Sequence, residues 1–397
     1  MRQTKWWISV LLVLMVAVVS ACGRAPDTTG QDTDQNQNQA LPPTEAPDTA
    51  QEEDTDSDAA PAGDPTEAEA VATEGDVAQP ATPSEFKESP KLAGGNLPAV
   101  QERLPKQPMV LQPVKSVGKH GGTWNTALKG TSDTAWLVRT IGYENLVRWK
   151  PNVKNFTADE IIPNIAESVD MNEDGSEYTF HLREGMKWSD GKPFTADDIM
   201  FWYEDVLSNE ELTPSVPSWL TAADKPVTVE RVDDVTVVFK FAGPSGLFLS
   251  RLATPVGEAP TNYPRHYLQQ FHKKYNPQVE AQAKQAQLDS WADLFTSKVS
   301  AWENPDKPVL NAWQLTKAVG DATQQLTAER NPYYWKVDTE GNQLPYIDTV
   351  AYRVTDDVEV MVLQALNGEI DFMDRHINAL ANKPVFFENQ EKGNYHF

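Results

Sequence analysis

The sequence contains a single cysteine, Cys22, among its 397 residues. One thiol cannot form an intramolecular disulfide, so cross-links within the chain cannot stabilise the fold. Hydrophobic residues make up 40% of the sequence. At this length, that fraction is enough for a sizeable core divided over about two or three domains.

Basic residues are also few, with 34 lysines and arginines against 58 acids and a net charge of -24 at pH 7. Seventeen of the acids lie in residues 23–95, which hold only three basic residues, Arg24, Lys87 and Lys91. No stretch is basic enough to attract nucleic acid, and an acidic surface repels it. The composition therefore excludes nucleic acid as a partner.

Aromatic residues are nearly absent between residues 23 and 95, where Asp, Glu, Gln, Thr, Ala and Pro dominate. Such a segment buries too little apolar surface to offset the entropy of ordering it. We therefore predict that residues 23–105 form an acidic, disordered tether, with order beginning near Leu104 to Gly121. A tether of this length lets a folded domain stand clear of a membrane.

Motifs of known enzymes are missing as well. There is no H-E-x-x-H pair, no P-loop and no G-x-S-x-G elbow. Asp170 to Gly175 resembles the start of a calcium loop, but the twelfth position, which needs a bidentate glutamate, is His181. The paired carboxylates at 197–198 and 356–357 stand at predicted helix starts, where capping explains them. We therefore predict no catalytic residue, no metal site and no cofactor.

The apolar run Trp6 to Val19 is short for a membrane span and follows Arg2 and Lys5, as in a secretory signal. It leads to Ser-Ala-Cys22, and small residues directly before a lone cysteine resemble the lipobox of bacterial lipoproteins. We predict a lipoprotein signal peptide over residues 1–22 and lipidation of Cys22. The protein would then be extracytoplasmic and anchored to the bacterial cell membrane by its N-terminal lipid. The alternative is an ordinary signal peptide with a stray cysteine.

The stretch Ile165 to Leu207 gives the clearest prediction of local secondary structure. Apolar residues alternate over 178–182 after a turn cluster at 172–175, which predicts a β-hairpin with one buried face. Thr195 is the predicted N-cap of the helix that follows. One face of this helix carries Ile199, Trp202, Tyr203 and Val206.

Further along, the sequence shows a strand, a helix and a second strand. Residues 350–354 alternate as a strand, and Asp356 with Glu359 forms a predicted capping box for the helix, which ends at Gly368. Glu369 to Phe372 is the second predicted strand, and such a crossover implies a parallel pair. Other strands are predicted over residues 122–128, 227–229 and 235–241.

Three stretches resemble one known family. AES…DGSEYTFHLREGMKWSDGKPFTADDIMF lies at 166–201, ERNPYYW with LPYID at 329–348, and LNGEID at 366–371. In this order they resemble the family 5 extracellular solute-binding proteins, the oligopeptide, dipeptide, nickel and oligosaccharide receptors of ABC importers. The resemblance covers roughly residues 121–397.

The resemblance implies an α/β, periplasmic-binding-protein-like fold with two lobes and an extra subdomain in lobe I. It places lobe I at 106–149 and 251–372, the extra subdomain at 150–250, and the start of lobe II at 373–397. Members of the family run some hundreds of residues longer. We therefore expect a truncated chain that holds lobe I and only the start of lobe II.

In the family, the first strand, the loop after it and the Y-E-x-L position approach the ligand cleft. The matching residues here are Thr131, Trp136, Tyr143 and Glu144. The resemblance implies that they contact the ligand, and we expect them to be solvent-exposed in a chain with one wall of the cleft. For Trp136 and Tyr143, ordinary core packing remains the alternative.

Two functions follow from these expectations. The first is a receptor that captures a small molecule, a peptide or an oligosaccharide, between two lobes and delivers it to ABC permease subunits. The second is a surface sensor or adhesive lipoprotein that uses the same fold without a transporter. The G-T-G-P-Y stretch common in peptide receptors is replaced by Lys307 to Trp313, whereas residues 333–348 look like the branch that includes oligosaccharide receptors. The ligand class stays open.

Overall fold

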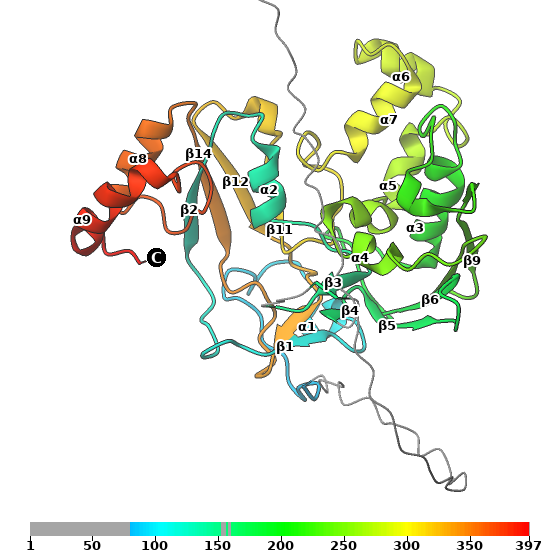
Figure 1. Ribbon diagram of the computed structural model, residues 1–397, viewed down its shortest axis with the longest axis horizontal. Coiled ribbons are helices and arrows are strands. Elements are labelled where there is room, and N and C mark those ends of the chain that lie inside the picture. Colours follow the sequence, from blue (N-terminus) through cyan, green and yellow to red (C-terminus); the bar gives the residue numbers. More distant parts are fainter. Residues whose placement is uncertain (1–79, 152–155, 158–159, 397) are drawn as a thin grey trace, which may run out of the picture. The chain divides into compact units, whose positions relative to one another are not determined.

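The computed structural model describes residues 80–151, 156–157 and 160–396 (Figure 1). The predicted signal peptide, Cys22 and residues 23–79 of the predicted tether lie outside these described residues. Two sheets of four strands dominate this part of the chain. None of its helices combines the length and the apolar character that crossing a membrane requires.

The first sheet is antiparallel and contains the predicted hairpin. Its strands, in spatial order, are β5 (Ala166–Met171), β6 (Glu177–Leu182), β10 (Thr236–Lys240) and β9 (Thr228–Arg231). Tyr178, Phe180 and Leu182 are buried while their neighbours are partly exposed, so the alternation in the sequence did mark a buried face. Residues 172–175 form the turn, with Gly175 at a φ of +68°. The hairpin prediction is confirmed.

Helix α3 (Ala196–Phe201) begins where the sequence predicts, at Thr195. The Thr195 hydroxyl accepts the amide of Asp197 at 3.3 Å, and the Asp198 carboxylate accepts the amide of Thr195 at 3.0 Å. This reciprocal capping satisfies free amides of the first turn. The helix continues as a π-helical turn over Trp202–Leu207.

Asp198 makes the stability of the protein depend on pH. The side chain is 5% exposed, and burial raises its pKa to about 6, against hydrogen bonds from the amides of Thr195 and Arg265. A raised pKa means that the folded state holds the proton more tightly, so this contribution to stability is present below about pH 4 and is lost as the pH rises through 6. Relative to Asp198→Asn, which cannot titrate, the protein should lose about 2 kcal/mol of unfolding free energy between pH 4 and pH 7. Urea unfolding of both proteins at the two pH values measures this; a difference that does not vary with pH would contradict it.

The second sheet is mixed and is covered on both faces. Its strands, in spatial order, are β11 (Trp313–Leu315), β12 (Gln325–Arg330), β14 (Thr349–Val354) and β2 (Thr123–Leu128). Only β14 and β2 are parallel, paired from Thr349 with Thr123 to Val354 with Leu128. One face packs against α2 (Thr134–Thr140). The other packs against α8 (Val358–Leu366) and α9 (Lys383–Gly393), as Figure 1 shows.

Three further pairs of short strands and several short helices accompany the two sheets. The paired short strands are β1 (Met109–Leu111) with β13 (Lys336–Asp338), β3 (Val147–Trp149) with β4 (Ile161–Pro163), and β7 (Thr221–Ala222) with β8 (Lys225–Pro226). The remaining α-helices of the described part are α1 (Val100–Arg103), α4 (Phe248–Leu252), α5 (Arg265–Leu268), α6 (Val279–Gln285) and α7 (Trp291–Val299).

The predicted second strand at Glu369–Phe372 is wrong. The segment does run beside β2, because the amide of Asp371 donates to the carbonyl of Asn125 at 2.8 Å. The amide of Asn125, however, donates to the side-chain carboxylate of Asp371 at 2.6 Å. The Asp371 carboxylate thus binds the backbone amide of Asn125, which in a regular pair of strands would donate to a backbone carbonyl. No regular pairing forms as a result.

The cap of α8 is also displaced from its predicted position. Asp357, not Asp356, accepts the amides of Glu359 at 2.8 Å and Val360 at 3.4 Å. The predicted end of the helix is confirmed, since Gly368 adopts a φ of +72° just after its last turn. Two adjacent aspartates are equally good caps by type, so the sequence could not distinguish them.

The tether prediction is wrong for residues 85–104, which we name the N-terminal strap. Its backbone pairs with the loop after β13 through Lys87, and the Ser89 hydroxyl donates to the Asp348 carboxylate at 2.7 Å. Val100 and Leu104 are buried against Val337 and its neighbours. Val100 and Leu104 stand in a largely polar segment without a periodic pattern, and only the tertiary structure shows that they are buried.

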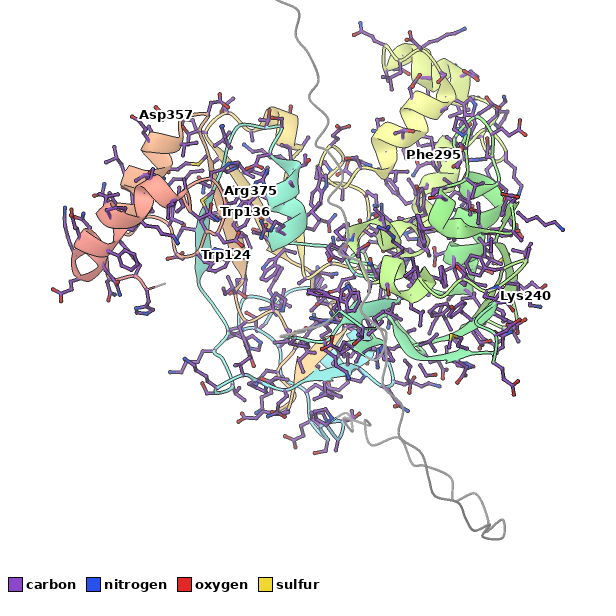
Figure 2. The ribbon with its side chains drawn as sticks, in the orientation of Figure 1. Trp124, Trp136, Lys240, Phe295, Asp357 and Arg375 are labelled. Atoms are coloured by element: carbon purple, nitrogen blue, oxygen red, sulfur yellow. The ribbon has the colours of Figure 1, made fainter. Side chains whose placement is uncertain are left out.

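The largest core cluster extends across the predicted subdomain boundary at residue 250. It joins Phe180 and Phe239 of the first sheet to Phe295 of α7 and to Trp335 (Phe295 is labelled in Figure 2). Residues 150–250 therefore share one core with the chain that follows, and packing does not break at 250.

Candidate functional site

The loop at residues 129–133 lies at the carboxyl ends of the parallel strands β2 and β14. The amide of Gly130 donates to the carbonyl of Thr355 at 3.2 Å, which joins the loops that leave the two strands. Gly130 adopts a φ of +70°, and an added Cβ would stand 2.4 Å from the Asp356 carboxylate, so this position requires glycine. Thr131 is exposed on this loop. Ligands of open α/β sheets bind beyond the carboxyl ends of the strands.

Asp133 ends this loop and binds a distant segment of the chain. Its carboxylate lies 3.0 Å from Nε of Arg375 and 2.7 Å from Nε2 of His376. Arg139 of α2 pairs with Asp374 at 2.8 Å. His376 itself adopts a φ of +63°, a conformation that is uncommon outside glycine. These contacts hold residues 374–376 against α2 and the loop before it (Figure 2).

Trp136 lies in the core of the protein. Its side chain is 1% exposed, and its indole Nε1 donates to the Thr126 hydroxyl at 3.1 Å. It packs with Leu326, Val350 and Tyr352 in the core beneath α2. The expectation that Trp136 is exposed is therefore wrong, and the alternative of core packing is confirmed.

The predicted ligand residues lie on both sides of α2. Thr131 precedes α2 and Tyr143 with Glu144 follows it. A helix of seven residues is about 10 Å long. Thr131 and Tyr143 therefore lie at opposite ends of the helix.

Glu144 is buried and fully engaged by the protein. Its side chain is 11% exposed, and the Lys336 ammonium donates to its two oxygens at 2.9 Å and 2.8 Å. The Tyr334 hydroxyl donates to one oxygen at 2.6 Å, and Nδ2 of Asn164 to the other at 2.8 Å. The expectation that Glu144 is exposed is wrong, because its acceptor capacity is used inside the protein.

The burial of this ion pair changes the pKa of each partner. Burial alone would raise the pKa of Glu144, but the Lys336 charge and the hydrogen bonds outweigh it, and the pKa lies below its ordinary value. Burial lowers the pKa of Lys336 to about 8, against the attraction of Glu144. Burial, reinforced by Glu144, raises the pKa of Tyr334 well above its ordinary value. The carboxylate is thus held ionised although it is buried.

A cavity of about 370 Å³ opens beside the Glu144–Lys336 pair. Tyr143, Arg148, Trp149, Asn145 and Asn164 contribute to its lining. The wall thus combines aromatic faces with groups that can donate or accept hydrogen bonds.

Sequence reasoning missed Lys336, Arg148 and the pair Arg375 and His376. Lys336 directly follows the ERNPYYW stretch, but nothing local indicates that its partner is Glu144. Arg375 and His376 lie 242 and 243 residues from Asp133. Only the sheet brings these side chains together.

A family model described as bacterial extracellular solute-binding proteins, family 5, middle part, matches residues 160–395. Among curated proteins, the periplasmic α-galactoside-binding protein of Rhizobium meliloti is 33% identical over 278 residues, which are 66% of this chain and 37% of that protein. A probable ABC transporter-binding protein of Deinococcus radiodurans is 28% identical over 61% of this chain and 36% of its own length.

Two solved structures are similar to the chain. An oligopeptide-binding protein, OppA, is 41% identical, with a TM-score of 0.72 over 79% of this chain and 49% of that one. The periplasmic binding protein MelB of Agrobacterium fabrum, in complex with stachyose, is 27% identical, with a TM-score of 0.61 over 77% of this chain and 46% of that one. The chain thus spans less than half the length of each of these proteins.

Proposed function

Because the chain belongs to the bacterial extracellular solute-binding proteins of family 5, we propose that it serves an ABC importer as its solute-binding receptor. In this role the protein captures a peptide or an oligosaccharide outside the cytoplasm and delivers it to the permease subunits. It acts by binding and performs no reaction on the ligand. The α/β, periplasmic-binding-protein-like fold, predicted from the sequence, is confirmed by the likeness to solved binding proteins.

The observation that carries the proposal is the junction at Asp133. The loop at residues 129–133 stands where α/β sheets bind ligands, and Asp133 fixes residues 374–376 beside it. In the family, the chain passes from lobe I toward lobe II at this point. Thr131 is the exposed residue of the predicted set on this loop and is our candidate for ligand contact. Trp136 supports the loop from the core beneath it.

Capture in such a receptor depends on closure of two lobes around the ligand. A closed form is favoured only by contacts that the open form lacks. The Asp133 junction would then give the moving part of the chain a fixed attachment to lobe I. The relatives suggest two ligand classes, since one binds α-galactosides, another is solved with stachyose, and a third is an oligopeptide-binding protein.

Mass spectrometry of what co-purifies with the full-length protein tests this proposal most directly. We expect a peptide or an oligosaccharide, and calorimetry with stachyose and with a mixed oligopeptide pool should reproduce saturable binding of one class. A protein that purifies empty and binds neither class would contradict the proposal. A ligand recovered in chemically altered form would indicate an enzyme instead.

The proposed membrane anchor rests on Cys22 and is tested separately. Cys22→Ser removes the only thiol of the chain and should abolish lipidation. We expect the variant to be released from the membrane or to be misprocessed, because the lipid can no longer be attached. Its urea unfolding midpoint should equal that of the unsubstituted protein. Retention of lipid and of membrane attachment in the variant would show that the lipobox interpretation is wrong.

A further inference from the structure

Residues 375–377 form a strained turn beside α2. The amide of Ile377 donates to the carbonyl of Arg375 at 2.7 Å, and His376 between them adopts a φ of +63°. A hydrogen bond of this span around a residue with positive φ defines the rare, strained form of the γ-turn. A residue other than glycine keeps such a conformation only where its surroundings hold it. The contacts of this turn therefore decide whether it persists.

The Asp133 carboxylate holds one side of this turn. Nε of Arg375 donates to its Oδ1 at 3.0 Å, and Nε2 of His376 donates to its Oδ2 at 2.7 Å. The Asp133 side chain is 3% exposed, and hydrogen bonds to a carboxylate are stronger than those between neutral groups. On the other side, Ile377 is 7% exposed and belongs to the core cluster around Met361. The turn is thus held by an ion pair on one side and by apolar packing on the other.

The same carboxylate also holds the loop at residues 129–133. The amide of Lys129 donates to Oδ2 of Asp133 at 3.2 Å, so Lys129 and His376 share one oxygen. Asp133 is the N-cap residue of α2, yet within the described part of the chain its side chain accepts no amide of that helix. Its acceptor capacity is therefore divided between the loop and the turn. A movement of either one changes the position of the oxygen that the other needs.

We infer that Asp133 is a latch that couples the loop at residues 129–133 to the turn at residues 375–377. With the latch closed, Asp133 keeps His376 in its strained conformation and sets the direction in which the chain leaves the second sheet. When the loop moves, the carboxylate withdraws, His376 relaxes to a negative φ, and the chain after it changes direction. The inference rests on the proposed function, because the loop is the one proposed for the solute. A solute bound at the loop thereby changes the path of the segment beyond the turn.

Hydrogen exchange at the amide of Ile377, measured on the full chain without any solute, tests the latch. Asp133→Asn keeps the size of the side chain but removes its charge and replaces one acceptor by a donor. We expect the Ile377 amide to exchange at least roughly tenfold faster in this variant, because the turn loses the charge-assisted hydrogen bonds that hold it. Amides of β6 in the first sheet should exchange at unchanged rates. An equal rise there would indicate general opening of the protein and would contradict the latch.

Gly130→Ala perturbs the loop without changing a residue of the turn. Gly130 adopts a φ of +70°, and an added Cβ would collide with the Asp356 carboxylate, so alanine displaces the loop. Because the latch transmits this movement, exchange at Ile377 should again be at least roughly tenfold faster. In the double variant with Asp133→Asn, the exchange rate should equal that of Asp133→Asn alone, since the link between loop and turn is already cut.

Gly142→Ala is the matched control. Gly142 adopts a φ of +73° just after α2, so its replacement strains the backbone similarly but lies outside the loop, and exchange at Ile377 should not change. Three results would overturn the inference: no change at Ile377 in Gly130→Ala, effects of Gly130→Ala and Asp133→Asn that add in the double variant, or an equal effect of Gly142→Ala. Because no solute is used, each of them would leave the proposed receptor function intact. A protein that binds neither a peptide nor an oligosaccharide would contradict that function without altering the exchange result.

Discussion

Lys336→Met is expected to lower the free energy of unfolding by about 3–5 kcal/mol, because it leaves the Glu144 carboxylate buried without its counter-charge. The Lys336 side chain is 3% exposed and donates to both Glu144 oxygens, so it supplies the counter-charge of this carboxylate. The hydrogen bonds from Tyr334 and Asn164 remain in the variant, but they do not neutralise the charge. Urea unfolding measures the loss as a shift of the midpoint.

The double variant Glu144→Gln with Lys336→Met is the control for this effect. It removes both charges and keeps an amide that can still accept from Tyr334. We expect it to recover most of the stability, since replacing a buried ion pair by neutral groups of similar volume is often close to neutral. A loss below about 1 kcal/mol in the single variant, or a double variant as unstable as the single one, would show that the ion pair does not control stability here.

Removal of residues 23–105 is expected to destabilise the protein by about 5 kcal/mol, because it deletes the N-terminal strap. Val100 and Leu104 are 7% and 4% exposed in the structure, and each buried side chain of this kind contributes roughly 1.5–3 kcal/mol. The hydrogen bond from Ser89 to Asp348 adds about 1 kcal/mol. The fully buried Arg103 side chain, which donates to the carbonyl of Pro98 at 3.0 Å and also contacts Glu88, is lost as well.

Removal of residues 23–79 alone distinguishes the strap from the tether. Residues 23–79 have the composition predicted for a disordered tether. Their removal should therefore leave the midpoint of urea unfolding unchanged. Limited proteolysis should likewise leave a resistant body that begins near residue 85, where the strap starts, rather than near Leu104. Equal midpoints for the two deletions would mean that the strap contributes nothing to stability.

The sequence alone determined the local elements of this protein. The β5–β6 hairpin could be predicted because apolar side chains alternate along one strand, and the start of α3 because Thr195 is a good cap at a fixed distance from Asp198. The three stretches that resemble the family were sufficient to predict the family and its fold. These signals are carried by residues close together in the chain, so no knowledge of the tertiary structure is needed to see them.

Only the tertiary structure decided which distant side chains meet. Asp348 binds Ser89 from 259 residues away, and Lys336 binds Glu144 from 192. The Asp371 carboxylate accepts a backbone amide of β2 in place of a backbone carbonyl. No alternation of residues in the sequence could indicate this contact. From the sequence we expected Trp136 to contact the ligand, whereas the structure buries it between α2 and the sheet. The register of β2 against β14 and the path of the N-terminal strap fix these pairs, because partners so far apart in the chain are brought together by packing and leave no pattern in the sequence.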